Sequence, residues 1–134
     1  MELTRQTEYA IKILLELAAQ PSGEVLSSKI ISERQDIPEE YLKKTVQLLA
    51  VNGLVITQRG TQGGVRLAKP ADKITIADVV TAIEGPFAIN PCLLPGYECK
   101  NSQTCVVRPV LIRAQNAMLL ELGKNTLADL INKK

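Results

Sequence analysis

Residues 36–69 read DIPEEYLKKTVQLLAVNGLVITQRGTQGGVRLAK, and this stretch decides the fold. Its first half predicts a helix, because Asp36 can serve as an N-cap, Pro38 suits the first turn, and the two glutamates that follow complement the helix dipole. Helical spacing of apolar residues predicts one buried face, and Gly53 ends the helix. The buried stripe is expected to consist of Tyr41, Leu42, Thr45, Leu48 and Leu49.

A β-hairpin is predicted immediately after this helix. Two short β-rich runs, 54–58 and 65–68, flank Gly60, Gly63 and Gly64, which can adopt left-handed backbone conformations at the tip. The GTQGG sequence therefore lies in a hairpin and not between a strand and a helix, so it does not predict a phosphate-binding loop.

Two helices are predicted before this stretch. Residues 5–19 carry apolar side chains close to helical spacing, and a second short helix begins at Ser27 or Ser28 and runs toward Arg34. The first helix is expected to use Tyr9, Ile13, Leu14, Leu17 and Ala18 as its apolar positions. Three helices followed by a hairpin make a winged helix-turn-helix, in which the third helix enters the major groove of DNA and the hairpin, or wing, contacts the backbone or the minor groove.

Helices are also predicted in the second half of the chain. One fits residues 76–84, with Thr75 as its cap and Asp78 in its first turn, and residues 85–104 look like a loop. A long helix then begins near Pro109, and a short helix around TLADLINKK follows. The apolar face of the long helix is expected to contain Val110, Leu111, Ala114, Ala117, Met118 and Leu122. The expected fold class is mainly α with a small β-hairpin.

Composition and charge narrow the function. The chain has 134 residues, of which 46% are hydrophobic and 22% charged, as expected for a soluble domain. We find no apolar run long enough to span a bilayer and no uncharged signal-peptide core, so a cytoplasmic protein without a membrane partner is expected. The absence of histidine and of nucleophile motifs argues against an enzyme.

Basic residues gather in one part of the chain. Between Tyr41 and Ala71 there is no acidic residue. The five basic residues of this stretch are Lys43, Lys44, Arg59, Arg66 and Lys69. Such a stretch is either a solvated face without a partner or a surface that faces an anion. It coincides with the predicted third helix and wing, and this agreement favours DNA binding.

All three cysteines lie in one short stretch, PCLLPGYECKNSQTCVVRP at residues 91–109. The three cysteines are Cys92, Cys99 and Cys105. Three thiols cannot all pair in disulfides within one chain, and they supply one ligand fewer than a tetrahedral metal site needs. In the cytoplasm, clustered cysteines more often bind metal than form disulfides.

With these features together, the chain resembles the IscR-like, Rrf-type transcriptional regulators, whose best-known members carry iron–sulfur clusters. The resemblance covers nearly the whole length and rests on MELTRQTEYAIKILLELA, ISERQDIPEEYLKK, VNGLVITQRGTQGGVRLAKP, ITIADVVTAIEG and the three-cysteine loop. It implies a homodimeric repressor on a pseudo-palindromic DNA operator. The implied division is a winged helix-turn-helix domain at 1–84, a cluster-binding loop at 85–105, and a dimerisation helix with a short final helix at 106–134.

The resemblance also implies which residues contact DNA. The matching positions on the third helix are Pro38, Glu40, Lys43, Lys44 and Gln47, and those on the wing are Arg59, Gly60, Thr61, Gln62 and Arg66. Some family members carry an acidic residue at the position of Lys43, whereas a lysine favours guanine or a phosphate, so the operator should differ from theirs. Phosphate attraction alone is an equal alternative for Lys43 and Lys44. Arg59 is similar to a wing arginine that enters a narrow minor groove.

The cysteine loop departs from the common family pattern. Its spacing is C-x6-C-x5-C instead of C-x5-C-x5-C, and Arg108 stands where some members have a histidine ligand. A guanidinium group has no lone pair for a metal. The resemblance still implies an iron–sulfur cluster, of the 4Fe–4S or 2Fe–2S type. For the thiols, a redox switch, a zinc site and no function remain alternatives. For the protein, the alternatives are a clusterless Rrf-type regulator controlled by thiol oxidation or by a protein partner, and a metal-binding accessory protein without a DNA role.

Three thiolates leave one iron position of such a cluster open. Glu98 adjoins Cys99 and is a poor candidate to reach it. Related nitric-oxide-sensing repressors use an acidic residue at the position of Glu8, donated by the partner subunit, which makes Glu8 the expected fourth ligand. The alternative is that Glu8 is a solvent-facing helix carboxylate.

Overall fold

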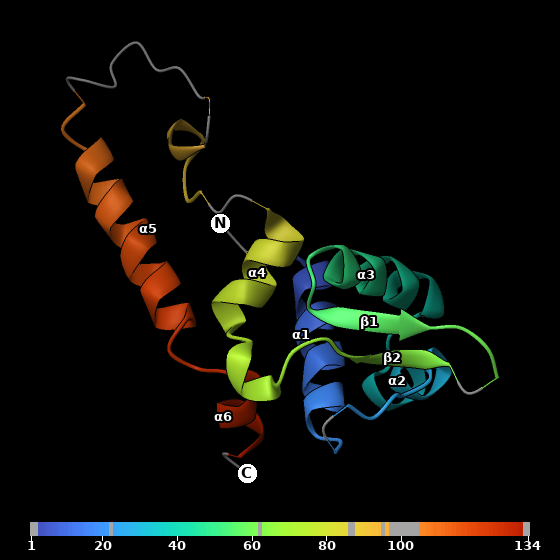
Figure 1. The fold of residues 1–134 in the computed structure, drawn as a ribbon. Coiled ribbons are helices and arrows are strands. Elements are labelled where there is room, and N and C mark those ends of the chain that lie inside the picture. The colour runs from blue at the N-terminus through green and yellow to red at the C-terminus, as the bar shows by residue number, and fades with distance from the viewer. Residues whose placement is uncertain are drawn as a thin grey trace.

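Three helices and a two-stranded hairpin form the N-terminal part of the fold, in the order expected of a winged helix-turn-helix (Figure 1). The computed structural model describes residues 3–21, 23–61, 63–85, 88–94, 96 and 105–132. The elements of this part are α1 (Arg5–Ala18), α2 (Ser28–Gln35), α3 (Glu39–Val51), β1 (Val55–Gln58) and β2 (Gly64–Leu67). The strands are antiparallel, with Val55 opposite Leu67 and Gln58 opposite Gly64.

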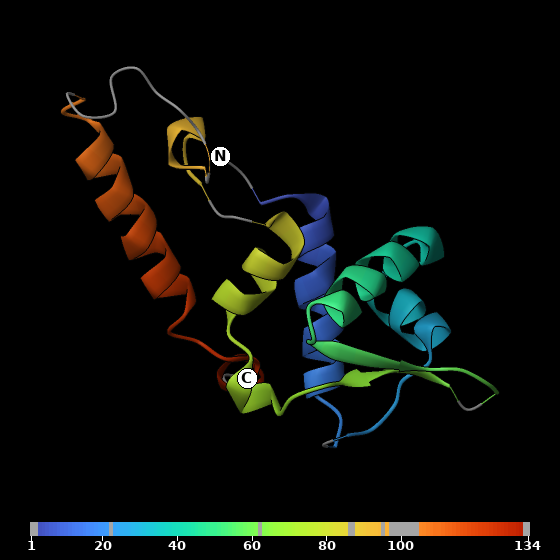
Figure 2. The same ribbon diagram turned by 45° about the horizontal axis from the view of Figure 1, so that its top comes forward.

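Helix α1 forms the centre of the molecule. Thr4 caps it by accepting a hydrogen bond from the backbone N–H of Thr7. Figures 1 and 2 show α1 between α2, α3 and the hairpin on one side and the C-terminal elements on the other. Its two apolar faces are therefore covered, and the side chains of Ala10, Ile13 and Leu14 have no exposed surface.

Helix α3 begins differently from the prediction. Asp36 is the left-handed C-cap of α2, with φ of 53°, and not the N-cap of α3. Aspartate adopts this conformation more readily than most residues, and here its N–H bonds the carbonyl of Ser32. Pro38 occupies the N-cap position of α3, without a side-chain cap.

The buried face of α3 is also shifted from the predicted one. It consists of Leu42, Thr45, Val46 and Leu49. Tyr41 is 55% exposed and Leu48 is half-buried, so their assignment to the buried stripe was wrong. The buried face of α3 therefore includes Val46, and Tyr41 lies at the solvent-exposed edge of this face.

The hairpin is attached to the core at its base. Leu26, just before α2, forms a bridge with Val65 of β2, in which each residue donates its N–H to the other's carbonyl at 2.9 and 2.8 Å. Val65 is 1% exposed and Val55 is 3% exposed. Gly64 is required here, because a Cβ at this position would clash with the backbone of Leu26.

The remaining elements are η1 (Ala71–Lys73), α4 (Ile76–Glu84), η2 (Pro91–Leu93), α5 (Arg108–Leu122) and α6 (Leu127–Ile131). The predicted start of α4 is confirmed, since Thr75 and Asp78 form a reciprocal capping box. The expected loop at 85–104 includes a short 3₁₀ turn, η2. No helix within the described ranges is long and apolar enough to cross a membrane.

The last helix returns to the N-terminal core. Leu127 of α6 has no exposed surface and belongs to the same core as Leu14 and Leu17. Its N–H donates to the carbonyl of Ile74 at 2.9 Å. Helix α5, in contrast, lies at the edge of the molecule beside α4 (Figures 1 and 2), and none of its residues is buried.

Candidate nucleic-acid interface and cysteine loop

One side of α3 is open to solvent and carries the predicted DNA-contacting residues. Glu40, Lys43, Lys44 and Gln47 are all exposed and lie three or four residues apart, so they share one face of the helix. Pro38 is exposed just before the first turn. This face lies opposite the buried one, and the structure therefore brings these five predicted residues onto one surface.

The wing presents a second group of predicted residues. Arg59, Gly60 and Thr61 are exposed at its tip, and Gly60 has φ of 105°, which favours glycine. Gln62 lies outside the described residues. Arg66 is separate from this group, since it is half-buried on β2 opposite Ile56. It lines a hollow of about 470 Å³ between the hairpin and the end of α1, together with Glu24 and Asp72.

A group of residues that the sequence did not reveal joins α1 to α3. The rings of Tyr9 and Tyr41 lie with their centroids 6.1 Å apart and their planes tilted by 54°. Beside them is a hollow of about 550 Å³, here called the tyrosine hollow, which is lined by Arg5, Gln6, Tyr9, Tyr41 and Lys44. The sequence predicts both tyrosines on the apolar faces of their helices, but nothing in the sequence pairs the two rings.

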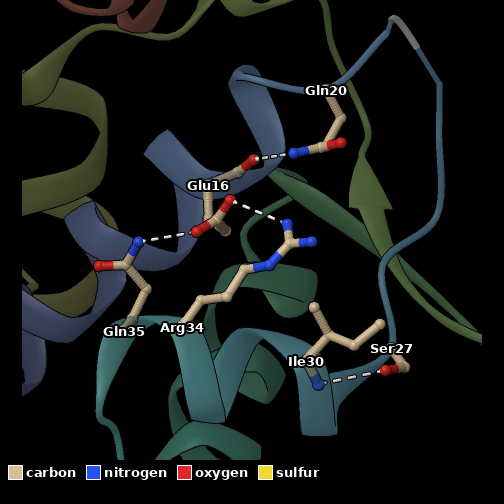
Figure 3. A network of polar contacts seen from close by, with 6 residues as sticks. All are labelled: Glu16, Gln20, Ser27, Ile30, Arg34 and Gln35. Atoms are coloured by element: carbon tan, nitrogen blue, oxygen red, sulfur yellow. Dashed lines mark hydrogen bonds and ion pairs between the residues drawn. The ribbon is translucent and has the colours of Figure 1, made fainter.

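A polar cluster fixes α2 against α1 (Figure 3). The Glu16 carboxylate accepts from Gln35 Nε2 at 2.9 Å and pairs with Arg34 at 3.5 Å. Ser27 caps α2 by accepting from the N–H of Ile30 at 3.2 Å. These contacts set the position of α2, against which α3 packs.

A second polar cluster joins the end of α4 to the start of α1. The Glu84 carboxylate accepts from the Thr4 hydroxyl at 2.6 Å, from the Thr4 N–H at 3.3 Å and from the Thr7 hydroxyl. Burial opposes the charge on Glu84, but the hydrogen bonds from Thr4 and Thr7 outweigh it, so the pKa of this carboxyl lies below its ordinary value. Glu84 directly precedes the segment that leads to the cysteines.

Helix α4 is also tied to the end of α3. Asn52 Nδ2 donates to the carbonyl of Ala82 at 3.2 Å and to that of Leu48 at 2.8 Å. The last turn of α4 therefore contacts both α1 and α3 through specific hydrogen bonds. The sequence offered no periodic signal for either contact.

Two of the three cysteines lie in the described residues, and both are free thiols with partial exposure. Cys92 lies in η2, where Asn90 Nδ2 is 3.2 Å from its sulfur, and Cys105 lies shortly before α5. Cys99 and Glu98 lie outside the described residues. Glu8 is exposed in the first turn of α1. Among the described residues, no three Cys, Asp or Glu side chains lie close enough together to hold a metal ion.

Helix α5 presents an apolar stripe to solvent. Val110, Ala114, Ala117 and Met118 are all exposed, with Val110 at 51% and Met118 at 39%. They lie at i, i+4, i+7 and i+8, which places them along one side of the helix. The predicted members Leu111 and Leu122 are half-buried and lie beside this stripe on the helix surface.

Comparison with known proteins gives the family. The family model described as "Iron-dependent Transcriptional regulator" matches residues 3–133. The chain belongs to the Rrf2 family of transcriptional regulators. Protein aau3 of Rhizobium meliloti is 39% identical to this Rrf2 chain over 136 residues, which cover 100% of the chain and 87% of aau3.

Solved Rrf2-like structures share the whole fold. CymR of B. subtilis, described as its global cysteine regulator, superposes with a TM-score of 0.79 at 29% identity, covering 100% of this chain and 98% of CymR. IscR of T. potens superposes with a TM-score of 0.77 at 26% identity, covering 98% of this chain and 87% of IscR. The predicted fold class, a mainly helical winged helix-turn-helix protein with one hairpin, is confirmed.

Proposed function

We propose that this Rrf2 protein is a cytoplasmic, homodimeric repressor that binds a pseudo-palindromic DNA operator. The observation that carries the proposal is the exposed, acid-free surface formed by α3 from Lys43 onward and by the wing tip. Lys43, Lys44 and Arg59 are all exposed on it. A helix of this kind reads base edges in the major groove, while cations on both elements attract phosphates.

The proposed roles differ between residues. Lys43 and Gln47 lie in the middle of the exposed face of α3, where a recognition helix is closest to base edges, and Pro38 and Glu40 lie at its entrance. On the wing, Arg59 is proposed to enter the minor groove, and Gly60, Thr61 and Gln62 are proposed to contact the DNA beside it. Arg66 is half-buried, so its proposed part is a more distant contribution to the positive potential.

Arg59→Ala is expected to weaken operator binding and to lower the slope of log K against log salt by about 0.9, because one cation near the phosphates is lost. The probe is a duplex selected by the wild-type protein from random-sequence DNA, with binding followed by fluorescence anisotropy. Lys124→Ala, which removes an exposed cation after α5, is the control and should change neither quantity. Equal affinity and slope for Arg59→Ala and wild type would remove Arg59 from the interface.

We further propose that an iron–sulfur cluster, 4Fe–4S or 2Fe–2S, controls operator binding. The chemistry of the donors fits, since Cys92, Cys99 and Cys105 supply three thiolates and Glu8 an oxygen, and Asn90 donates to the sulfur of Cys92. Hydrogen bonds to a ligating sulfur tune cluster potential. When bound, such a cluster supplies sensitivity to iron supply, redox state or nitric oxide. The family description and the likeness to IscR support this reading.

The contacts of α4 support a route from the cysteine loop to the DNA-binding face. The loop begins just after Glu84, which holds Thr4 and Thr7 of the α1 start, and Ala82 is held by Asn52 after α3. A rearrangement of the loop that displaces the last turn of α4 would act on both helices. Glu8, in the same first turn of α1 as Thr7, is proposed to reach the cluster of the partner subunit, so that the cluster would join one subunit's loop to the other's DNA-binding part.

A thiol-controlled regulator without a cluster is the second candidate, and the likeness to CymR favours it. Iron and sulfide counts with visible spectra of anaerobically purified protein separate the two. Bound iron and sulfide that are lost in Cys92→Ser support the cluster. Protein without iron whose DNA affinity changes reversibly with oxidants and thiols supports the second candidate.

Glu8→Ala is expected to leave a labile or spectrally altered cluster, because one iron would lose its oxygen ligand. The matched control, Glu98→Ala, removes a carboxylate next to Cys99 and should leave the cluster unchanged. The measurements are the visible spectrum, the rate of cluster loss in air, and operator affinity before and after loss. If Glu8→Ala protein reconstitutes with wild-type spectra, stability and DNA response, another group is the fourth ligand.

A further inference from the structure

The tyrosine hollow holds a set of donors of which the proposed recognition surface uses only Lys44. Its lining consists of two cations, two phenols and one amide, from Arg5, Lys44, Tyr9, Tyr41 and Gln6. Each of these side chains can donate a hydrogen bond, and two carry a fixed positive charge. Glu8 and Glu40, which are exposed on the same two helices, are not part of the lining. The hollow therefore has the chemistry of a site for an anionic oxygen group.

The position of the hollow indicates which anion it meets. Lys44 belongs both to its lining and to the exposed face of α3 that carries Lys43 and Gln47. Tyr41, in the first turn of α3, is more than half exposed beside it. The hollow thus lies directly at the border of the proposed DNA-reading face. When a helix occupies the major groove, the phosphates that line the groove pass along such a border.

We infer that the tyrosine hollow binds a DNA backbone phosphate, with Arg5 and Lys44 as the cations and Tyr41 as a neutral donor. This inference rests on the proposed function and extends the interface to α1, which the recognition helix and the wing leave out. Arginine, lysine, tyrosine and glutamine are all frequent phosphate contacts in protein–DNA complexes. The contact of the Tyr9 and Tyr41 rings holds α1 and α3 in register, so the two cations are presented together.

Such a contact would set the orientation of α3 in the groove without reading a base. Phosphate contacts fix how a recognition helix is oriented in the groove. Because Arg5 comes from a different helix than Lys44, a phosphate held by both restrains α3 against rotation about its own axis. Loss of Arg5 should therefore weaken binding to all operator variants by a similar factor.

The test compares Arg5→Ala, Tyr41→Phe and a control, Lys12→Ala, on the duplex selected from random-sequence DNA by the wild-type protein. Lys12 is an exposed cation on α1 that does not line the hollow. Arg5→Ala is expected to lower the salt slope by about 0.9, Tyr41→Phe to weaken binding without a change in slope, and Lys12→Ala to change neither. Thermal unfolding of each variant checks that the fold is retained.

A modified duplex locates the contact. Single methylphosphonate substitutions, placed in turn along the duplex, should identify one phosphate whose neutralisation weakens wild-type binding but has no further effect on Arg5→Ala. Arg5→Ala with wild-type affinity and slope would overturn the inference. If Arg59→Ala lowers the slope and Arg5→Ala does not, only this inference fails. If the wild-type protein selects no duplex, the proposed function itself fails.

Discussion

Met118→Glu is expected to convert the proposed dimer into a monomer and to reduce operator affinity by about 100-fold or more. The exposed stripe Val110, Ala114, Ala117 and Met118 has no partner among the described residues, and its two alanines would let a second α5 approach closely. A carboxylate placed in such an interface loses its hydration without gaining a partner. A dimer that contacts two half-sites binds DNA about 100-fold or more tightly than a monomer that contacts one half-site. A monomeric variant loses this factor in affinity.

Asn116→Glu is the matched control for this substitution. Asn116 is exposed on the same helix, but it lies on the side away from the stripe. Sedimentation equilibrium gives the oligomeric state of both variants, and anisotropy gives their affinity for whole and half operators. A Met118→Glu protein that remains dimeric would show that α5 does not pair through this stripe.

Gly64→Ala is expected to destabilise the fold by about 3 kcal/mol. A Cβ at this position would clash with the carbonyl oxygen of Leu26 and would lie 2.6 Å from its carbon and 2.9 Å from the Cα of Ser27. All of these are backbone atoms, held by the two hydrogen bonds between Leu26 and Val65. The wing can therefore accept the methyl group only by separating from the core.

Gly123→Ala provides the comparison. Gly123 has φ of −82°, and the nearest atom to an added Cβ is the Leu119 carbonyl oxygen at 3.3 Å. We expect its cost to stay below about 1 kcal/mol. Urea unfolding of both variants measures the difference. Equal stabilities would mean that the hairpin base rearranges freely, which the paired hydrogen bonds argue against.

The elements of the fold that could be predicted are mostly those marked by a pattern within a few neighbouring residues. The capping box of Thr75 and Asp78, the helical spacing of α1 and the glycines of the wing are all visible in short windows of sequence. Asp36 was assigned wrongly because aspartate favours both N-caps and left-handed C-caps, and the end of α2 competes with the start of α3 for this residue. Tyr41 was placed in the core because its ring fits the apolar period, although it is more than half exposed and its ring contacts the half-buried Tyr9 at the edge of the core.

The candidate site also contains features that local sequence signals predict and features that they do not. The exposure of Lys43, Lys44 and Gln47 follows from helical period once the buried face is known. The contacts that join Tyr9 to Tyr41 and Thr4 to Glu84 connect residues far apart in the chain, and no period within one element reports them. They arise only when α1, α3 and α4 pack together.

The placement of α1 has a consequence for how the chain folds during its synthesis. Thr4 and Glu84 are 80 residues apart, and Leu127 completes the core that covers Leu14 and Leu17. Contacts across long stretches of chain form late, because closing a long loop costs entropy before the contact can repay it. As the ribosome extends the chain, α1 emerges before the elements that cover it and keeps part of its apolar surface uncovered until residue 127 has left the exit tunnel. A helix made before its packing partners is therefore among the last to be buried.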